Sequence, residues 1–248
     1  MFERALSAGT RPALLWMHGG GFVVGRPEQD MAIVSRILDR IDIAIISIDY
    51  RLAPEHPFPA PLDDCHAALC WLVEHASELD IDIKRIAIGG QSAGGGLAAA
   101  LVQRVADNGP IVPAFQLLVY PMLDAQTGRS DHGARGQFLW TPKNNIFGWT
   151  SYLGRDPKTG DFPNYAVPAR RASLTGLPPA WIGVGTLDLF HDEDVEYGNR
   201  LRGAGIDCVT HVVEGAYHGF DGVKPEANAT ASFYDSMLRA LAEKLAME

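Results

Sequence analysis

The chain has 248 residues, of which 47% are hydrophobic and 21% charged, and its formal net charge is −9. These values are ordinary for a globular protein and fit one large α/β domain, with a sizeable core, or at most two small ones. The negative charge argues against nucleic acid or an anionic membrane as the main partner. No apolar run approaches the roughly 20 residues that a membrane span needs.

The chain contains three cysteines, Cys65, Cys70 and Cys208. An odd, sparse set without a CxxC pair is not a disulfide framework, and no Cys/His cluster has the spacing of a zinc site. We interpret these residues as buried thiols in a reducing compartment. The segment from Met1 to Arg11 lacks the apolar stretch of a signal peptide, so we expect a cytoplasmic protein.

Short apolar runs alternate with helical patterns along the chain. The predicted strands are Ala13–Met17, Ile43–Ile48, Arg85–Gly89, Phe115–Tyr120, Ala180–Gly185 and Cys208–Val213. The predicted helices are Asp30–Arg40, Pro61–Ala76, Ala93–Ala106, Lys143–Leu153, Asp194–Arg202 and Glu226–Ala246. This alternation predicts a single α/β domain over residues 1–248, with a mostly parallel sheet of six strands and helices on both faces.

The segment from Asp124 to Pro179 interrupts the alternation. It is rich in Gly, Pro and Trp, and its one good helical pattern is Lys143–Leu153. Because so long an excursion inside an α/β fold often carries function, we expect a lid or a part of the substrate pocket over about residues 124–179.

The sequence from Gly90 to Gly94 matches the G-x-S-x-G pattern of a nucleophile elbow, with Ser92 at its centre. Five-residue patterns occur by chance, but this one lies between a predicted strand and a predicted helix. A sharp turn there lifts the serine hydroxyl above the sheet, and the two glycines leave room for the turn. The alternative is a Gly-rich turn without chemistry.

Three consecutive glycines follow His18, directly after the first predicted strand. Such a loop exposes backbone N–H groups, which acyl transfer needs to stabilise a negatively charged oxygen. The alternative of a phosphate-binding loop lacks the lysine of a P-loop and the dinucleotide fingerprint. We expect His18 itself to hold the loop by hydrogen bonding rather than to react.

A serine nucleophile needs a base and an acid that orients the base, in the chain order Ser, Asp/Glu, His. Asp188 follows the fifth predicted strand and His218 follows the sixth, so both lie at carboxyl ends where active-site groups collect. The other candidates for the base are His191, His211 and His132, and those for the acid are Asp192, Asp194 and Asp221. Among these, Asp192 is the main rival to Asp188, and we expect it to cap the next helix.

Five motifs together resemble those of the hormone-sensitive-lipase-like esterases, or bacterial esterase family IV. They are the HGGGF sequence at His18–Phe22, DYRLAPEHPFPA at Asp49–Ala60, QSAGG at Gln91–Gly95, GTLD at Gly185–Asp188 and YHGFD at Tyr217–Asp221. The resemblance runs from about Pro12 to the C-terminus.

This resemblance implies an α/β-hydrolase fold in which the second predicted strand lies at one edge, followed by the first, third, fourth, fifth and sixth. It implies hydrolysis of short- to medium-chain acyl esters, with Ser92, Asp188 and His218 as the triad. The implied oxyanion donors are the N–H groups of Gly20, Gly21 and Ala93, and Asp49–Ala60 is implied to brace the site.

No metal or organic cofactor is implied, and the partner is a small-molecule ester. Two alternatives stay open: another acyl-transfer enzyme (amidase, lactonase or acyltransferase), and a non-catalytic ligand-binding relative. Relatives of the second kind have lost the catalytic histidine, whereas His218 is in place here.

Two features depart from the family pattern. Gln91 stands where an acidic residue usually precedes the serine, and the family usually has a longer segment, with cap helices and two strands, before its glycine loop. The resemblance therefore implies an N-terminally shortened fold in which Ile43–Ile48 becomes an edge with unpaired backbone groups. We expect self-association or a loss of stability to follow, and a homodimer through the other edge, at Cys208–Val213, is also compatible with the family.

Overall fold

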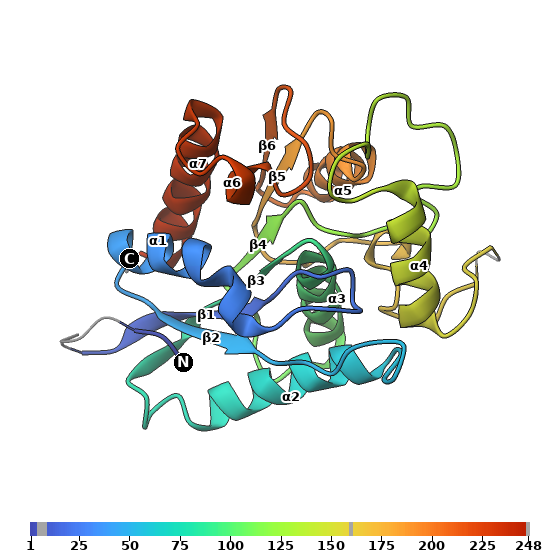
Figure 1. Cartoon of the computed structure of the whole chain (residues 1–248). Helices are drawn as coiled ribbons and strands as arrows, with labels where there is room; N and C mark the ends of the chain where they lie inside the picture. Colours follow the sequence, from blue (N-terminus) through green and yellow to red (C-terminus); the bar gives the residue numbers. More distant parts are fainter. Residues whose placement is uncertain (4–8, 159–160, 247–248) are drawn as a thin grey trace.

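A computed structural model describes residues 1–3, 9–158 and 161–246 of the chain. Six strands form one parallel sheet in the order β2-β1-β3-β4-β5-β6 (Figure 1). The strands are β1 (Arg11–Met17), β2 (Ala44–Ile48), β3 (Ile81–Gln91), β4 (Phe115–Val119), β5 (Ala180–Gly185) and β6 (Cys208–Val213). All six predicted strands and their predicted order are confirmed.

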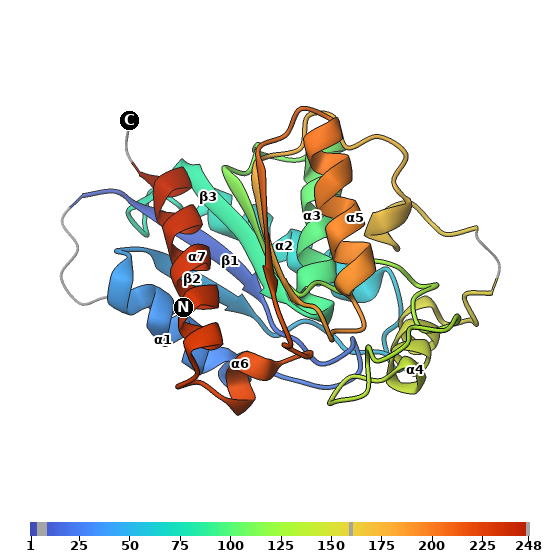
Figure 2. The ribbon, with the colours of Figure 1, turned by 90° about the horizontal axis from the view of Figure 1, so that it is seen from above.

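The helices cover both faces of the sheet. They are α1 (Met31–Arg40), α2 (Ala60–Glu74), α3 (Ala93–Asn108), α4 (Pro142–Leu153), α5 (His191–Gly203), α6 (Phe220–Val223) and α7 (Asn228–Leu245), with short 3-10 turns at Pro27–Asp30 and Pro168–Arg170. Seen from above, α1 and α7 lie on one face, and α2, α3 and α5 lie on the other (Figure 2). Fold class and layering are those of an α/β hydrolase.

Strand β1 shows why the sheet needs two covering layers. Its alternate residues face opposite sides: Leu15 joins the core cluster that contains α2, α3 and α5 residues, and Trp16 joins the cluster that contains α1 and α7 residues. Both side chains are fully buried. A strand that is buried on both faces has a continuous apolar sequence, and this pattern allowed β1 to be predicted.

The N-terminal end of the chain corrects one expectation about the edge strand. Phe2 pairs with Ile45 of β2 through an antiparallel bridge, with N···O distances of 2.8 Å and 2.9 Å in the two directions. The edge is therefore not wholly unpaired, because one residue near the start of the chain satisfies two of its backbone groups. Residues 4–8, which connect Phe2 to the sheet, lie outside the described part.

Helix boundaries differ from the predicted ones most clearly at α5, which begins at His191 rather than Asp194. The predicted excursion at 124–179 contains α4 and long irregular stretches, and its residues 159–160 lie outside the described ones. None of the helices in the described ranges is long and apolar enough to cross a membrane.

Candidate active site

Ser92 occupies a strained turn between β3 and α3. Its φ is 56° and its ψ is −123°, a conformation that non-glycine residues rarely adopt. Neighbouring glycines make the turn possible: a Cβ at Gly90 would lie 2.4 Å from the carbonyl oxygen of Gly94, and a Cβ at Gly94 would lie 2.1 Å from that of Met17. The serine hydroxyl is thus held at the carboxyl end of the central strand.

The glycine loop lies directly beside Ser92. A Cβ at Gly19 would be 3.4 Å from the Cβ of Ser92, and Gly20 and Gly21 have φ values of +122° and +61°, which favour glycine. His18 is buried, and its Nδ1 lies 2.7 Å from the carbonyl oxygen of Gly19. Burial lowers the pKa of His18, so its imidazole is neutral and serves the loop as a hydrogen-bonding group.

The segment Asp49–Ala60 braces this loop from the side. Tyr50 stacks on the His18 ring at 4.2 Å between centroids, and its hydroxyl donates a 2.7 Å hydrogen bond to the carbonyl oxygen of His18. The N–H of Ala53 donates to the carbonyl oxygen of Phe22 at 2.9 Å. The loop is therefore fixed at both of its ends.

Three predicted site residues from three different connections form one hydrogen-bonded chain. The Nε2 of His218 lies 2.9 Å from the Oγ of Ser92, and its Nδ1 lies 2.8 Å from Oδ2 of Asp188. Asp188 is fully buried, and its other oxygen accepts the N–H of Phe190 at 3.0 Å. A carboxylate held in this way favours the imidazole tautomer that has a proton on Nδ1 and can accept the serine proton at Nε2.

The rival histidines are engaged elsewhere. The Nδ1 of His191 lies 2.9 Å from Oδ1 of Asp192, and the His132 ring accepts the N–H of Gly128 at 2.9 Å. His211 stacks on Trp181 within the sheet.

The rival acids are also placed away from His218. Asp192 was predicted to cap α5, and this is wrong: the capping position is Phe190, and the Asp192 side chain points outward to Arg135 at 2.6 Å. The physical reason is that the carbonyl oxygen of Phe190 already accepts the N–H of Asp194 at 3.0 Å, so the helix starts before Asp192 could cap it. Asp221 accepts the hydroxyl groups of two buried tyrosines. Asp194 is buried, and burial raises the pKa of its carboxyl well above the usual range.

A polar network behind the triad was not predicted from the sequence. The Nε2 of Gln91 donates to Oδ1 of Asp30 at 2.5 Å, and its Oε1 lies 3.2 Å from the Tyr120 hydroxyl. Burial raises the pKa of Asp30 to about 6, although the hydrogen bond from Trp16 Nε1 (2.8 Å) works in the opposite direction. The Tyr120 ring packs edge-on against the ring of His218 at 4.7 Å. Gln91, the departure from the family pattern, therefore joins the buried carboxylate to the ring that supports the histidine.

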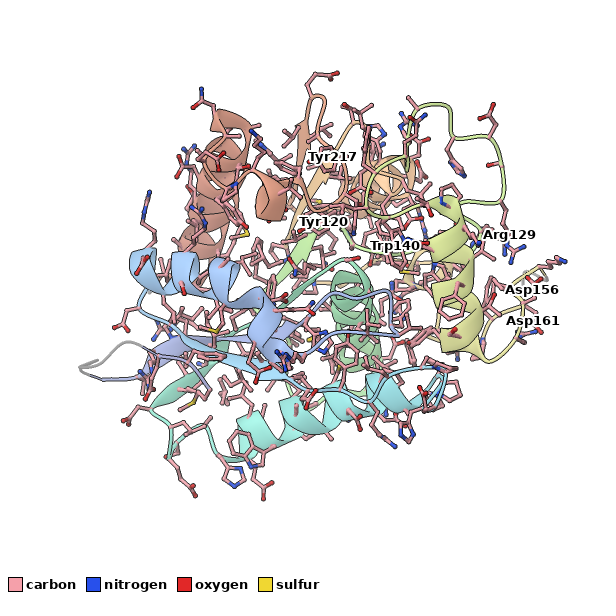
Figure 3. All side chains as sticks on the ribbon, viewed as in Figure 1. Tyr120, Arg129, Trp140, Asp156, Asp161 and Tyr217 are labelled. Carbon is pink, nitrogen blue, oxygen red and sulfur yellow. The ribbon has the colours of Figure 1, made fainter. Side chains whose placement is uncertain are left out.

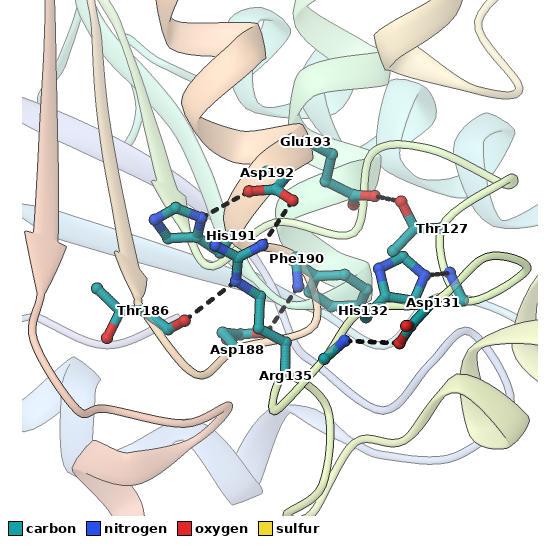
Figure 4. A network of polar contacts seen from close by, with 12 residues as sticks. Thr127, Asp131, His132, Arg135, Thr186, Asp188, Phe190, His191, Asp192 and Glu193 are labelled. Carbon is teal, nitrogen blue, oxygen red and sulfur yellow. Dashed lines mark hydrogen bonds and ion pairs between the residues drawn. The ribbon is translucent and has the colours of Figure 1, made fainter.

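The excursion is tied to the connection that carries Asp188. Arg135 donates from Nε to the carbonyl oxygen of Thr186 at 3.2 Å and pairs with Asp192, while the Thr127 hydroxyl donates to Glu193 (Figure 4). Burial raises the pKa of Glu193 well above its usual range. These contacts fasten the start of the excursion to the connection between β5 and α5, which carries Asp188.

Trp140 belongs to the excursion and Tyr217 to the connection that follows β6 (Figure 3). Trp140 comes from the excursion, and its ring centroid is 6.3 Å from that of His218. Its position depends on contacts across the fold, and a lone tryptophan in a loop-rich segment gives no pattern that could have revealed it. Among the described residues, no group of three or more His, Cys, Asp or Glu could hold a metal ion.

Comparison with known proteins places this geometry in a family. A family described by its alpha/beta hydrolase fold matches residues 14–222. The chain belongs to the α/β-hydrolase family. Its resemblance to the hormone-sensitive-lipase-like esterases is confirmed by the relatives that follow.

Two relatives from Mycobacterium tuberculosis are 35% identical to the chain. One is esterase LipI, aligned over 85% of this chain and 66% of the relative, and the other is carboxylic ester hydrolase LipN, over 96% and 65%. The solved structure of a bacterial heroin esterase superposes with a TM-score of 0.92 at 39% identity, over 97% of this chain and 77% of that one. The chain thus spans just under two thirds of the length of the first two relatives.

Proposed function

We propose that this protein is a serine carboxylesterase that hydrolyses short- to medium-chain acyl esters through an acyl-enzyme on Ser92. The observation that carries the proposal is the hydrogen-bonded chain from Ser92 through His218 to buried Asp188, with distances of 2.9 Å and 2.8 Å. The names of its relatives as esterases support the same reaction class.

In the proposed reaction His218 takes the Ser92 proton at Nε2, and the serine oxygen attacks the ester carbonyl. The negative oxygen of the tetrahedral intermediate accepts hydrogen bonds from the N–H groups of Gly20, Gly21 and Ala93. His218 then protonates the leaving alcohol, and Asp188 stabilises the imidazolium throughout. In the second half His218 activates a water molecule, which releases the acid and restores Ser92.

Residues 1–248 act as one domain in this proposal, and the excursion at 124–179 covers the entrance to the triad as a substrate-pocket segment. Its support is the set of contacts from Arg135 and Thr127 to the Asp188 connection, and the position of Trp140 near His218. A cytoplasmic location and a homodimer through β6 stay predictions.

The test is hydrolysis of a chain-length series of p-nitrophenyl esters by the purified protein and by Ser92→Ala. We expect the substitution to lower kcat/KM by at least about 10³-fold, because it removes the atom that forms the acyl-enzyme. Ser77→Ala, at an exposed turn, is the matched control and should retain full activity. Turnover near that of the unchanged protein in Ser92→Ala would refute the mechanism, and a preference for amides or lactones would reassign the reaction.

A further inference from the structure

The indole of Trp140 lies on the glycine loop beside the triad. A Cβ at Gly21 would be 2.1 Å from Cη2 of Trp140 and 2.9 Å from both Cζ2 and Cζ3, so the six-membered ring occupies the space of the missing side chain. The same indole is 6.3 Å from His218 between ring centroids. Trp140 therefore stands next to the proposed oxyanion donors Gly20 and Gly21.

Contacts inside the excursion fix the orientation of this indole. Its Nε1 donates a 3.1 Å hydrogen bond to Oδ1 of Asn145, whose side chain is fully buried. The Nδ2 of Asn145 in turn donates to the carbonyl oxygen of Thr127 at 2.7 Å. The second glycine in contact is Gly148 of α4, where a Cβ would be 3.5 Å from Cζ2 of Trp140 and 2.7 Å from the carbonyl oxygen of Gly21. Helix, loop and indole are thus packed without side chains between them.

The geometry of acyl transfer indicates which part of an ester substrate lies beside Trp140 and the glycine loop. The carbonyl oxygen points to the N–H groups of the glycine loop, and the leaving oxygen must lie near Nε2 of His218, which protonates it. The acyl arm takes the remaining direction, past the glycine loop, where the indole of Trp140 lies against Gly21. We infer that Trp140 is the wall against which the acyl arm ends, and that it limits the length of the acyl group the site accepts. This inference rests on the proposed esterase function.

The experiment compares the unchanged protein with Trp140→Leu and Trp140→Phe on two ester series. In the first series the acyl group is lengthened from acetate through butyrate and hexanoate to octanoate on p-nitrophenol. In the second series the acetyl group is kept and the alcohol is lengthened. Phe147→Leu is the matched control, because Phe147 is an exposed aromatic residue of α4, the helix that follows Trp140.

We expect Trp140→Leu to raise the octanoate-to-acetate ratio of kcat/KM about tenfold or more, since even one methylene that a hydrophobic pocket accepts or rejects changes kcat/KM by about tenfold or more. Trp140→Phe should give a smaller rise in the same direction. The alcohol series, and both series with Phe147→Leu, should follow the unchanged protein. If the melting curve of Trp140→Leu shows unfolding, Trp140→Phe decides the question.

An unaltered acyl profile in a folded Trp140 variant would overturn the inference, and so would a change confined to the alcohol series. Absence of hydrolysis by the unchanged protein would be a different result, because it would overturn the proposed function itself before any Trp140 variant is measured.

Discussion

The carboxyl end of the sheet and the excursion at 124–179 meet at the same site but are built differently. At the sheet, Ser92, Asp188 and His218 each follow a strand, and hydrogen bonds within the parallel register set their positions. In the excursion, Trp140 is held by a chain of side-chain contacts within loops and one helix. In the proposed function, the strand ends carry the reaction class and the loop segment selects the substrate.

The strongest test of the strand-end region exchanges the triad acid. Asp188→Asn should lower turnover by about 10³–10⁴-fold, because the amide favours the histidine tautomer that cannot accept the serine proton. Asp192→Asn is the matched control from the same connection, and it loses the mostly exposed ion pair with Arg135 and weakens the contact with His191. Steady-state kinetics on p-nitrophenyl acetate measure both variants. A large loss in Asp192→Asn with a small one in Asp188→Asn would reassign the acid.

A pH-dependent test addresses the network behind the triad. Burial disfavours the charge of Asp30 and raises its pKa from the usual 3.8 to about 6 in the folded protein. Between these two pH values the unfolded chain has lost the Asp30 proton while the folded protein still holds it. Because of Asp30, the free energy of unfolding therefore falls as pH rises through this range. The total decrease is about 3 kcal/mol once the pH is above both pKa values.

Asp30→Asn should remove this part of the pH dependence of the free energy of unfolding. Urea unfolding at a series of pH values between about 4 and 7 measures it. Burial also raises the pKa values of Glu193 and Asp194, which add a pH dependence of the same sign in both proteins. The test is therefore the difference in pH dependence between the unchanged protein and Asp30→Asn. Parallel curves for the two proteins would contradict the assignment of Asp30.

The smallest expected effect concerns the attachment of the excursion. Arg135→Gln removes the ion pair with Asp192 and weakens the contact with the carbonyl oxygen of Thr186. We expect faster limited proteolysis within residues 124–140 and a change in kcat of less than about threefold, because local opening requires little free energy when the core is untouched. Arg129→Gln is the comparison variant, because it loses an ion pair with Asp156, which also belongs to the excursion. Equal cleavage rates in the unchanged protein and Arg135→Gln would contradict this attachment.

The sequence allowed much of the strand-end region to be predicted, for physical reasons. Continuous apolar runs mark buried parallel strands, and the glycines around Ser92 are required by backbone crowding that the structure shows at Gly90 and Gly94. The strand order came from the family resemblance rather than from any residue pattern.

What could not be predicted depends on contacts between distant segments. Phe2 pairs with Ile45 across 43 positions of the chain, as the numbering shows, and no local pattern announces such a bridge. The start of α5 was misplaced because the hydrogen bond from the Asp194 N–H to the carbonyl oxygen of Phe190 is a consequence of the folded connection. Trp140 is the extreme case, since its role depends on the space left by Gly21.

The central claim is that Ser92 carries the acyl group during turnover. Rapid mixing of the protein with p-nitrophenyl acetate, followed by acid quenching and peptide mass spectrometry, tests it directly. The account predicts one acetyl group on the peptide that contains Ser92, absent from Ser92→Ala and reduced in His218→Ala. Ester hydrolysis without acetylation of Ser92, or acetylation that persists on another residue in Ser92→Ala with activity retained, would contradict it.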